Sequence, residues 1–166
     1  MIEVTIDSIR VSLMSQHRVV ILKDGETDRY LPIWIGACEA DAITIELQGV
    51  EVARPFTHDL LKSSITQLGG KIKSVVISDL RSEVFYAQIV LDVNGRRMEI
   101  DSRPSDALAL AVRAKVPIFV SEDVMEKAAI TPEEDLSEGS SEDKLKGSPF
   151  SDLIDGLNLD DFGEGN

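Results

Sequence analysis

The chain of 166 residues contains few cysteines, histidines and aromatic residues, and it lacks a long apolar run. Its single cysteine, Cys38, excludes an intramolecular disulfide and a cysteine-rich zinc site. Two histidines, His17 and His58, are too few for a histidine-based metal cluster. The longest uncharged apolar stretch is residues 30–38. It is far shorter than the roughly 18 residues that span a membrane.

The first ten residues, MIEVTIDSIR, alternate acidic and apolar side chains. They lack the basic start and the apolar stretch of a signal peptide. We therefore expect a soluble cytoplasmic protein without a membrane partner.

Basic residues are also scarce, with 17 Lys and Arg against 30 Asp and Glu, for a net charge of -13. Taken whole, this charge argues against a sequence-independent DNA binder, which usually presents a basic surface. The charge is unevenly placed, however. Residues 131–166 hold 11 acidic and two basic residues, whereas residues 1–130 hold 19 and 15. The remaining net charge of -4 admits a polyanionic substrate, but it predicts weak binding without divalent cations.

The chain is 43% hydrophobic, which is enough to form a core, and its length suits one domain with a tail. We expect a domain at 1–130 and a largely disordered acidic tail at 131–166. Within this tail, Phe150, Ile154 and Phe162 are interleaved with aspartates. Two interpretations stay open: a solvated tail, or a peptide that docks on the domain or on a partner protein.

Hydrophobic periodicity predicts strands grouped in hairpins, with helices between the groups. Asp24-Gly25 and Asn94-Gly95 are hairpin signals, the latter for a type I′ turn. The predicted strands are 2–13 (with a break near 7–8), 18–23, 30–35, 75–78, 84–93, 96–100 and 117–120, and the predicted helices are 38–48, 57–68, 104–114 and 121–128. This order predicts an α+β fold with a mostly antiparallel or mixed sheet and about four helices.

Two helix starts share a pattern of arginine, proline, hydroxyl and aspartate. One is residues 54–59, RPFTHD, where we expect Thr57 to cap the helix; the other is residues 101–106, DSRPSD, where Ser102 or Ser105 would do so. An aspartate in the first turn complements the helix dipole, but an arginine adds positive charge to a positive end. Each arginine therefore needs an anionic partner: a nearby carboxylate, or a phosphate shared with free backbone N–H groups.

Other side chains near these starts suit acid–base or metal chemistry. Asp101 and Asp106 flank the second start, and Glu39 begins an earlier helix. Such carboxylates either hold Mg²⁺ or simply complement a helix dipole. His58 either acts as general acid or base, or is an ordinary residue of the first helical turn.

Several segments together resemble the bifunctional nuclease family: 31–36 with Glu39, 54–61, 85–87, 101–107 and 117–120. The resemblance covers roughly residues 3–129. It implies an α+β domain that forms a homodimer and has nuclease activity on DNA and RNA.

The leading hypothesis is a metal-assisted phosphodiesterase acting on nucleic acid. The predicted catalytic residues are His58, which transfers the proton, Asp59, which orients His58, and Arg103. Arg54, Thr57 and Ser105 are predicted to bind the substrate. The predicted Mg²⁺ ligands are Asp101, Asp106 and Glu39. One alternative is a non-catalytic domain that binds an anion, a nucleotide or a protein. Another is a structural role, with the arginines and aspartates bridging each other in a dimer.

Overall fold

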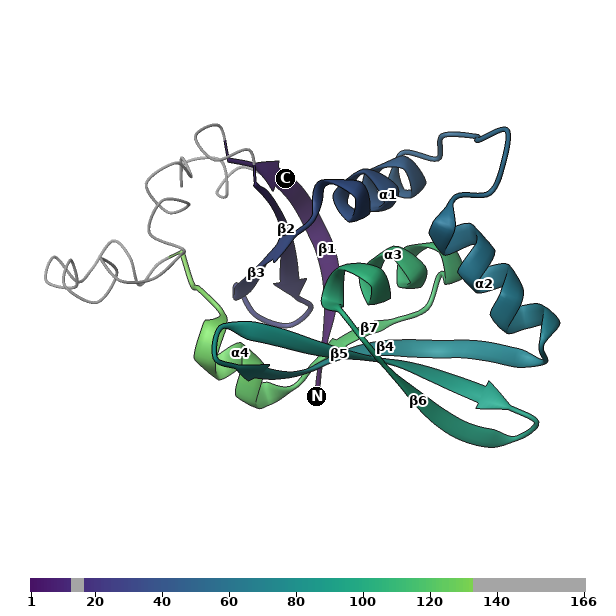
Figure 1. Ribbon diagram of the computed structural model, residues 1–166. Helices are drawn as coiled ribbons and strands as arrows, with labels where there is room; N and C mark the ends of the chain where they lie inside the picture. The colour runs from purple at the N-terminus through teal and green to yellow at the C-terminus, as the bar shows by residue number, and fades with distance from the viewer. Residues whose placement is uncertain (13–16, 133–166) are drawn as a thin grey trace, which may run out of the picture.

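The strands of the computed structural model, which describes residues 1–12 and 17–132, form one sheet in the order β3-β2-β1-β7-β4-β5-β6 (Figure 1). Their bounds are β1 (Ile2–Val11), β2 (Arg18–Asp24), β3 (Tyr30–Ile35), β4 (Gly70–Arg81), β5 (Val84–Val93), β6 (Arg96–Ser102) and β7 (Ile118–Val120). All neighbours are antiparallel except β4 and β7, which are parallel. The predicted α+β class with a mixed sheet is confirmed.

The first three strands form a meander. The predicted break in β1 is a register shift between Ile6 and Ser8 in the pairing with β2. The β2–β3 connection is organised by the buried carboxylate of Asp24, which accepts hydrogen bonds from the Glu26 amide at 2.9 Å and the Thr27 hydroxyl at 2.6 Å. The guanidinium of Arg29 also contacts Asp24, at 2.7 Å.

A second meander contains β4, β5 and β6. Asn94 and Gly95 have φ values of 53° and 77°, as the predicted type I′ turn requires. Strand β4 is much longer than the predicted 75–78. The prediction is too short because the outer parts of the strand contain solvent-facing polar residues, which resemble a loop in the sequence. These residues still pair with β5.

Strand β7 joins the two meanders. Ile118 aligns with Val4 of β1 on one side and with Val75 of β4 on the other. The short strand predicted at 117–120 therefore completes the sheet.

Four helices occur in the part of the chain that the structure describes: α1 (Ala37–Leu47), α2 (Thr57–Gln67), α3 (Pro104–Ala114) and α4 (Glu122–Ala128). In Figure 1, α1, α2 and α3 lie together on one side of the sheet. Helix α3 packs against both α1 and α2 and buries most of its residues, whereas His58 is the buried residue of α2.

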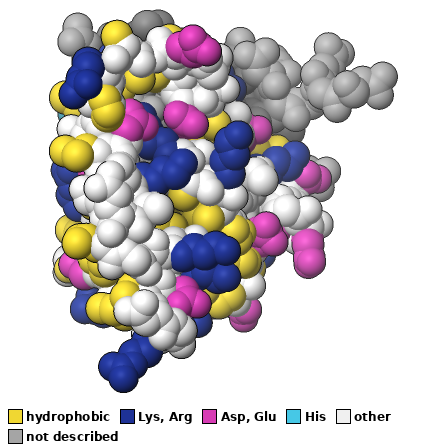
Figure 2. Space-filling model, turned by 90° about the vertical axis from the view of Figure 1, so that its right-hand side faces the viewer, with side chains coloured by type: hydrophobic (Ala, Val, Ile, Leu, Met, Phe, Trp, Pro, Cys, Tyr) yellow, Lys and Arg dark blue, Asp and Glu magenta, His cyan; other side chains and the backbone are white. Residues whose placement is uncertain are grey.

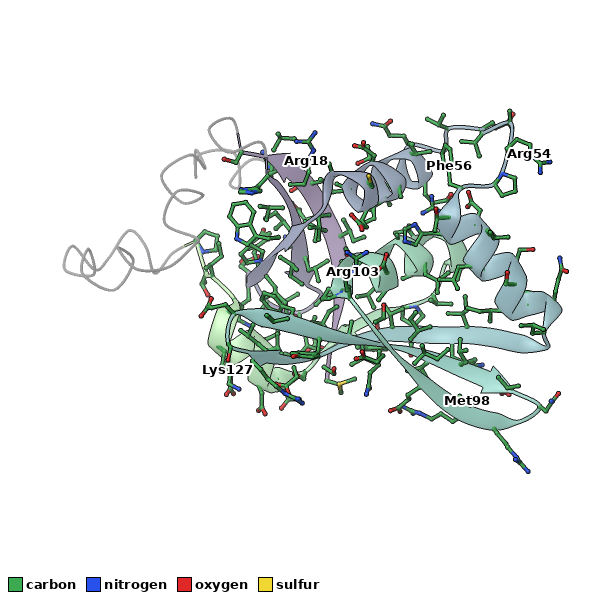
Figure 3. All side chains as sticks on the ribbon, viewed as in Figure 1. Arg18, Arg54, Phe56, Met98, Arg103 and Lys127 are labelled. Carbon is green, nitrogen blue, oxygen red and sulfur yellow. The ribbon has the colours of Figure 1, made fainter. Side chains whose placement is uncertain are left out.

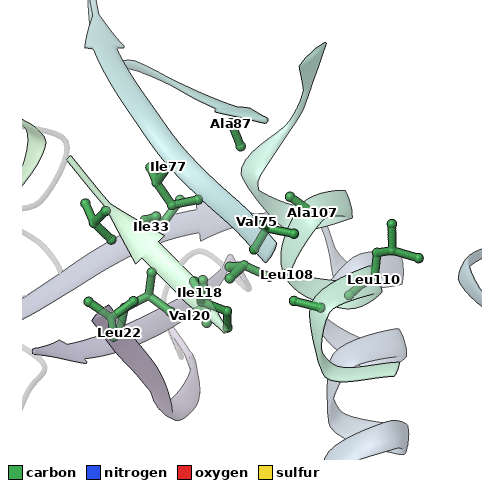
Figure 4. Close-up of a cluster of buried hydrophobic side chains, with 14 of the residues drawn as sticks. Val20, Leu22, Ile33, Val75, Ile77, Ala87, Ala107, Leu108, Leu110 and Ile118 are labelled. Atoms are coloured by element: carbon green, nitrogen blue, oxygen red, sulfur yellow. The ribbon is translucent and has the colours of Figure 1, made fainter. Parts of the chain in front are cut away.

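The main core lies between the sheet and α3. Leu108 and Leu110 of α3 belong to the same cluster of buried residues as aliphatic side chains from both meanders, such as Val20 and Ile77, and Leu108 points toward the strands (Figure 4). All four side chains are fully buried. Because this core fixes α3 against the sheet, it also fixes the start of α3, where the candidate site lies.

The helix caps differ in part from those expected. Ser121 caps α4 as predicted, its hydroxyl accepting from the Val124 amide at 3.3 Å. The expected cap at Thr57 is wrong, because Phe56 holds the N-cap position and the Asp59 carboxylate accepts from the Phe56 amide at 2.9 Å. A carboxylate three residues into the helix thus replaces the hydroxyl.

The serine cap expected for α3 is also wrong. Arg103 is the N-cap residue and has no side-chain capping bond. Ser102 instead donates to the Arg103 carbonyl, and Ser105 is buried within the first turn.

The domain ends in a backbone pairing between Ile130 and Tyr30, with two hydrogen bonds of 2.8 Å. Nearly all of the predicted acidic tail, and its expected disorder, lies outside the described residues. No helix within residues 1–12 and 17–132 is long and apolar enough to cross a membrane.

Candidate functional site

The first turns of α1, α2 and α3 meet at one pocket. Its volume is about 570 Å³, and its lining includes Cys38 and Glu39 of α1, Thr57 and His58 of α2, and Asp106 of α3. Helix N-termini carry partial positive charge and unpaired N–H groups. Three of them at one pocket favour an anionic ligand.

Arg103 connects two of these turns. Its Nη2 donates to Glu39 Oε1 at 2.6 Å, and its Nε donates to Asp106 Oδ2 at 2.8 Å. Figure 3 shows Arg103 at the start of α3, facing α1. The side chain of Arg103 remains 67% exposed, whereas that of Glu39 is only 15% exposed. The carboxylates therefore hold the guanidinium at the pocket and leave its other N–H groups accessible.

A glycine permits this placement of Glu39. Gly36, just before α1, lies so close to the Glu39 carboxylate that a Cβ there would collide with it. A side chain at position 36 would displace the carboxylate and weaken its ion pair with Arg103.

His58 completes the cluster from α2. Its ring is nearly buried, and its Nε2 lies 3.0 Å from Asp106 Oδ1. Asp106 thus contacts His58 through one oxygen and Arg103 through the other. Glu39, His58, Arg103 and Asp106 thus form one cluster. Its contacts join residues that lie 48 and 64 positions apart in the sequence.

The protonation of Asp106 determines the role of the imidazole. Burial alone would raise the pKa of Asp106, but hydrogen bonds from Arg103 and His58 hold this pKa below its usual value. Ionised Asp106 can only accept hydrogen bonds, so Nε2 of His58 is the donor. In the neutral ring, Nδ1 is then the basic nitrogen. The same contacts, first with Asp106 and then with Glu39, raise the pKa of Arg103.

Asp59 was expected to orient His58, but the structure places it elsewhere. Its Oδ1 accepts from Arg113 Nε at 2.8 Å. Arg113 is buried and also donates to the carbonyls of Ala42 and Ala109. Burial would raise the pKa of Asp59, but bonds from Phe56 and Arg113 lower it. Asp59 therefore balances a buried charge, and the expected contact with His58 is made by Asp106 instead.

The remaining predicted residues separate into two groups. Thr57 lines the pocket, whereas Ser105 is buried beside it and lines a neighbouring depression with Arg103. Arg54 is exposed and lines a second pocket of about 260 Å³ (Figure 3). Among the described residues, it forms no hydrogen bond or ion pair. The two Arg-Pro segments are thus not equivalent: Arg103 is the N-cap of its helix, while Arg54 lies in the loop before α2.

The predicted Mg²⁺ ligands do not form one group. Asp101 is exposed on β6 and does not line the pocket with Glu39 and Asp106. Glu39 and Asp106 are instead bridged by Arg103. Across residues 1–12 and 17–132, no cluster of three or more His, Cys, Asp or Glu is arranged to hold a metal ion. Of the three carboxylates expected to bind Mg²⁺, Glu39 and Asp106 thus lie together at the pocket, and Asp101 lies apart from them.

Sequence reasoning missed part of the pocket wall. Asp41 adds a third carboxylate, and Pro55, Phe56 and Ile45 form an apolar side. Phe56 is 43% exposed and also lines the second pocket. The spacing of Glu39 and Asp41 does not predict that Asp41 lines the pocket. For the apolar side, the sequence offers one indication, which is the aromatic Phe56 directly after the Arg-Pro pair.

The described surface is not uniformly acidic. The face in Figure 2 shows separate groups of Lys and Arg between hydrophobic and acidic side chains. This agrees with the small net charge of residues 1–130 and is compatible with binding of an anionic ligand.

Comparison with known families assigns the domain to a family. A family model for the bifunctional nuclease domain matches residues 20–133, which include all four clustered residues. The chain belongs to the bifunctional nuclease domain family. Residues 54–61 and 101–107, which carry the resemblance seen in the sequence, supply three of the four.

Relatives of this bifunctional nuclease domain occur in bacteria and plants. An uncharacterized protein of Mycobacterium tuberculosis is 42% identical over 164 residues, covering 96% of this chain and 97% of that protein. Bifunctional nuclease 1 of Arabidopsis thaliana is 32% identical over 110 residues, and bifunctional nuclease 2 of Oryza sativa subsp. japonica is 33% identical over 105 residues. These matches cover 63% and 61% of this chain but only 34% and 32% of the plant proteins.

Proposed function

We propose that this chain cleaves phosphodiester bonds of nucleic acid at the pocket where α1, α2 and α3 begin. The observation that carries the proposal is Asp106, which contacts His58 at 3.0 Å and Arg103 at 2.8 Å beside an open pocket. Family membership and the names of the plant relatives support a nuclease-related role.

In the proposed reaction, Nδ1 of His58 takes a proton from the attacking hydroxyl or water. The new P–O bond forms as the bond to the leaving oxygen breaks, and the imidazolium returns the proton to that oxygen. Asp106 stabilises the imidazolium and fixes its orientation. The free N–H groups of Arg103 bind the charged phosphoryl oxygens, helped by the three helix N-termini.

The pocket also imposes an electrostatic cost. Glu39, Asp41 and Asp106 outnumber Arg103, so a polyanion meets net negative charge. Arg54 offers a second cation on the far side of Phe56, at the neighbouring pocket. A nucleic acid strand that crosses both pockets would meet Arg103 and Arg54, with a base against the apolar wall. Glu39 and Asp106 remain the pocket carboxylates that would hold a divalent cation such as Mg²⁺, which would offset part of this negative charge.

The test is cleavage of supercoiled plasmid and RNA by the purified full-length protein, with and without EDTA. We expect His58→Ala and Arg103→Ala to lower the rate by about 10²-fold or more, as for loss of a general base or a charge-stabilising group. Lys127→Ala on the exposed side of α4 is the control and should cleave at the wild-type rate. Unchanged cleavage by both pocket variants would indicate a contaminating nuclease and refute the proposal.

A non-catalytic pocket is the second candidate. It is favoured by the engagement of Arg103 with two carboxylates and by the apolar wall at Pro55 and Phe56. This pocket would bind a nucleotide or phosphorylated metabolite without cleaving a polymer. A thermal-shift screen distinguishes the two, since a binder is stabilised by its ligand. Stabilisation by mononucleotides without polymer cleavage would favour this candidate.

A further inference from the structure

Arg113 is a buried charge that the proposed reaction does not use. It lies in the last turn of α3, and its side chain is only 2% exposed. Its Nε donates to Asp59 of α2 at 2.8 Å, and its Nη2 donates to the Ala42 carbonyl of α1 at 3.0 Å. Its Nη1 donates to the Ala109 carbonyl within α3 at 2.9 Å. One guanidinium therefore contacts all three helices whose first turns form the pocket.

Helix α2 has little apolar packing of its own. Its Leu60 and Leu61 are exposed, and Ile65 is only partly buried against the core. His58 is the buried residue of this helix. Packing of an apolar face usually fixes a helix on its domain. The position of α2, and of His58 with it, therefore depends strongly on polar contacts.

The polar contacts of α2 reach α3 at two separate points. In the first turn of α3, Asp106 contacts His58 at 3.0 Å. In the last turn, the guanidinium of Arg113 binds Asp59, and the carbonyl of Arg113 accepts from Lys62 Nζ at 2.7 Å. Asp106 and Arg113 lie seven positions apart, which is about 10 Å along a helix axis. A helix that is held at one point can pivot, whereas contacts at two separated points fix its direction.

Stability alone does not explain why this ion pair is buried. Apolar side chains of similar volume often stabilise a fold as well as a buried ion pair does. The carbonyls of Ala42 and Ala109 lie inside helices, where they also accept backbone N–H groups of the next turn, so neither depends on the guanidinium. An apolar side chain cannot reproduce the planar set of N–H donors, which fixes several acceptors at once.

We propose that Arg113 is a positioning residue: by binding α1 and α2 from the end of α3, it keeps His58 in contact with Asp106. This role rests on the proposed function, in which that contact orients the imidazole and stabilises its protonated form. Arg113 acts through His58 and needs no contact with the substrate.

A paired substitution in the full-length protein separates positioning from stability. Arg113→Met combined with Asp59→Asn removes both charges together and keeps an oxygen at position 59 for the Phe56 amide. Because neither charge is left alone, the free energy of unfolding in urea should stay close to the wild-type value. The kcat for RNA cleavage should fall about 10²-fold or more, with KM nearly unchanged, since Arg103 keeps both of its carboxylate partners. A wild-type kcat in this variant would overturn the proposal.

A double-mutant cycle tests the same contact without measuring cleavage. The effects of His58→Ala, Asp106→Asn and their combination on urea unfolding are compared in two proteins, the wild type and Arg113→Lys. Lysine keeps the positive charge but replaces the planar donors with one ammonium group. Residues in contact give non-additive effects, so we expect coupling in the wild type and additive effects in Arg113→Lys. Lys127→Ala is the control and should keep the wild-type coupling.

The two measurements distinguish a failure of this role from a failure of the proposed function. A wild-type protein that cleaves no nucleic acid refutes the proposed function, while the cycle still tests Arg113. Equal coupling in the wild type and in Arg113→Lys would overturn the positioning role, even if the wild type cleaves RNA. So would a wild-type protein in which His58 and Asp106 show no coupling.

Discussion

At the residue scale, Asp106 holds the cluster together because it binds both His58 and Arg103. Asp106→Asn keeps the shape but removes the charge that orients the imidazole and stabilises its protonated form. If His58 is the general base, kcat should fall about 10²- to 10⁴-fold with little change in thermal stability. Steady-state cleavage kinetics and a melting curve measure the two effects. A kcat near the wild-type value would show that His58 acts without Asp106.

Asp59 should behave in the opposite way, through stability. Arg113 is 4% exposed, and Asp59 supplies its carboxylate partner. Asp59→Ala leaves the guanidinium buried without that partner and also removes the bond to the Phe56 amide. We expect a loss of about 3 kcal/mol in the free energy of unfolding, measured by urea denaturation. Asp123→Ala, in the exposed first turn of α4, is the control. An unfolding free energy equal to that of the wild type would contradict this role.

The sequence identified which residue types gather at the site, but not how they pair. Glu39, His58, Arg103 and Asp106 all stand at helix starts, so local patterns suffice to select them. The neighbours His58 and Asp59 were expected to interact, yet adjacent helix residues point in different directions. Their partners, Asp106 and Arg113, lie 48 and 54 positions away. Only the packing of α2 on α3 determines those contacts.

At the element scale, the β2–β3 connection contains a pH-sensitive contact. Burial would raise the pKa of Asp24, but bonds from Thr27, Glu26 and Arg29 lower it from 3.8 to about 2. A lowered pKa stabilises the fold above the unfolded value, and this stabilisation is lost as pH falls through 3.8 toward 2. Asp24→Asn should therefore cost about 2 kcal/mol at pH 6.

The cost of Asp24→Asn should shrink steadily below pH 4. Urea unfolding of wild type and variant across this range measures the difference. A pH-independent difference would mean that the ionised carboxylate contributes nothing beyond its shape.

Helix α2 should be the most easily opened of the three helices around the pocket. It buries His58, whereas α3 buries eight residues, among them Leu108 and Leu110. Since local stability follows buried apolar contact, residues 57–67 should exchange amide hydrogens faster than residues 104–114. Hydrogen-exchange mass spectrometry of these two segments gives the comparison. Equal protection would show that α2 opens only with the whole domain.

Element types were predictable from the sequence, but sheet order was not. The strand predicted at 84–93 matches the observed bounds of β5, and Asn94-Gly95 predicts the turn after it. Strand β4 was underpredicted because its exposed polar residues resemble a loop. The place of β7 between β1 and β4 depends on contacts between distant parts of the chain. Periodicity, which is a local signal, contains no information about them.

At the scale of the whole molecule, charge separates the domain from the residues after it. Residues 133–166 hold 11 acidic residues and two lysines, which is most of the net charge of -13. Ile130 still belongs to the domain, because its backbone pairs with that of Tyr30. A truncation after residue 132 therefore keeps the bridge, whereas one before residue 130 removes it.

This separation predicts how truncation changes nucleic-acid binding. A protein ending at residue 132 has a net charge of -4 and repels a polyanion less. Its affinity for a short RNA should rise roughly tenfold at low ionic strength and match the full-length protein at high salt, where charges are screened. Fluorescence anisotropy over a salt series measures both limits. An equal affinity at low salt would show that these residues do not influence binding.

Truncation could raise the affinity for RNA for two reasons: it removes charge repulsion, or it removes a peptide that occupies the pocket. A full-length variant with Phe150, Ile154 and Phe162 changed to Ala distinguishes them. This variant keeps every charge, so if simple repulsion is the cause, its affinity for RNA should equal that of the wild-type protein. If the acidic peptide instead occupies the arginine-lined pocket, its apolar side chains contribute to docking, and their loss should raise affinity as truncation does. The tail then competes with nucleic acid for Arg103 and Arg54, and the low-salt gain of the alanine variant measures that competition.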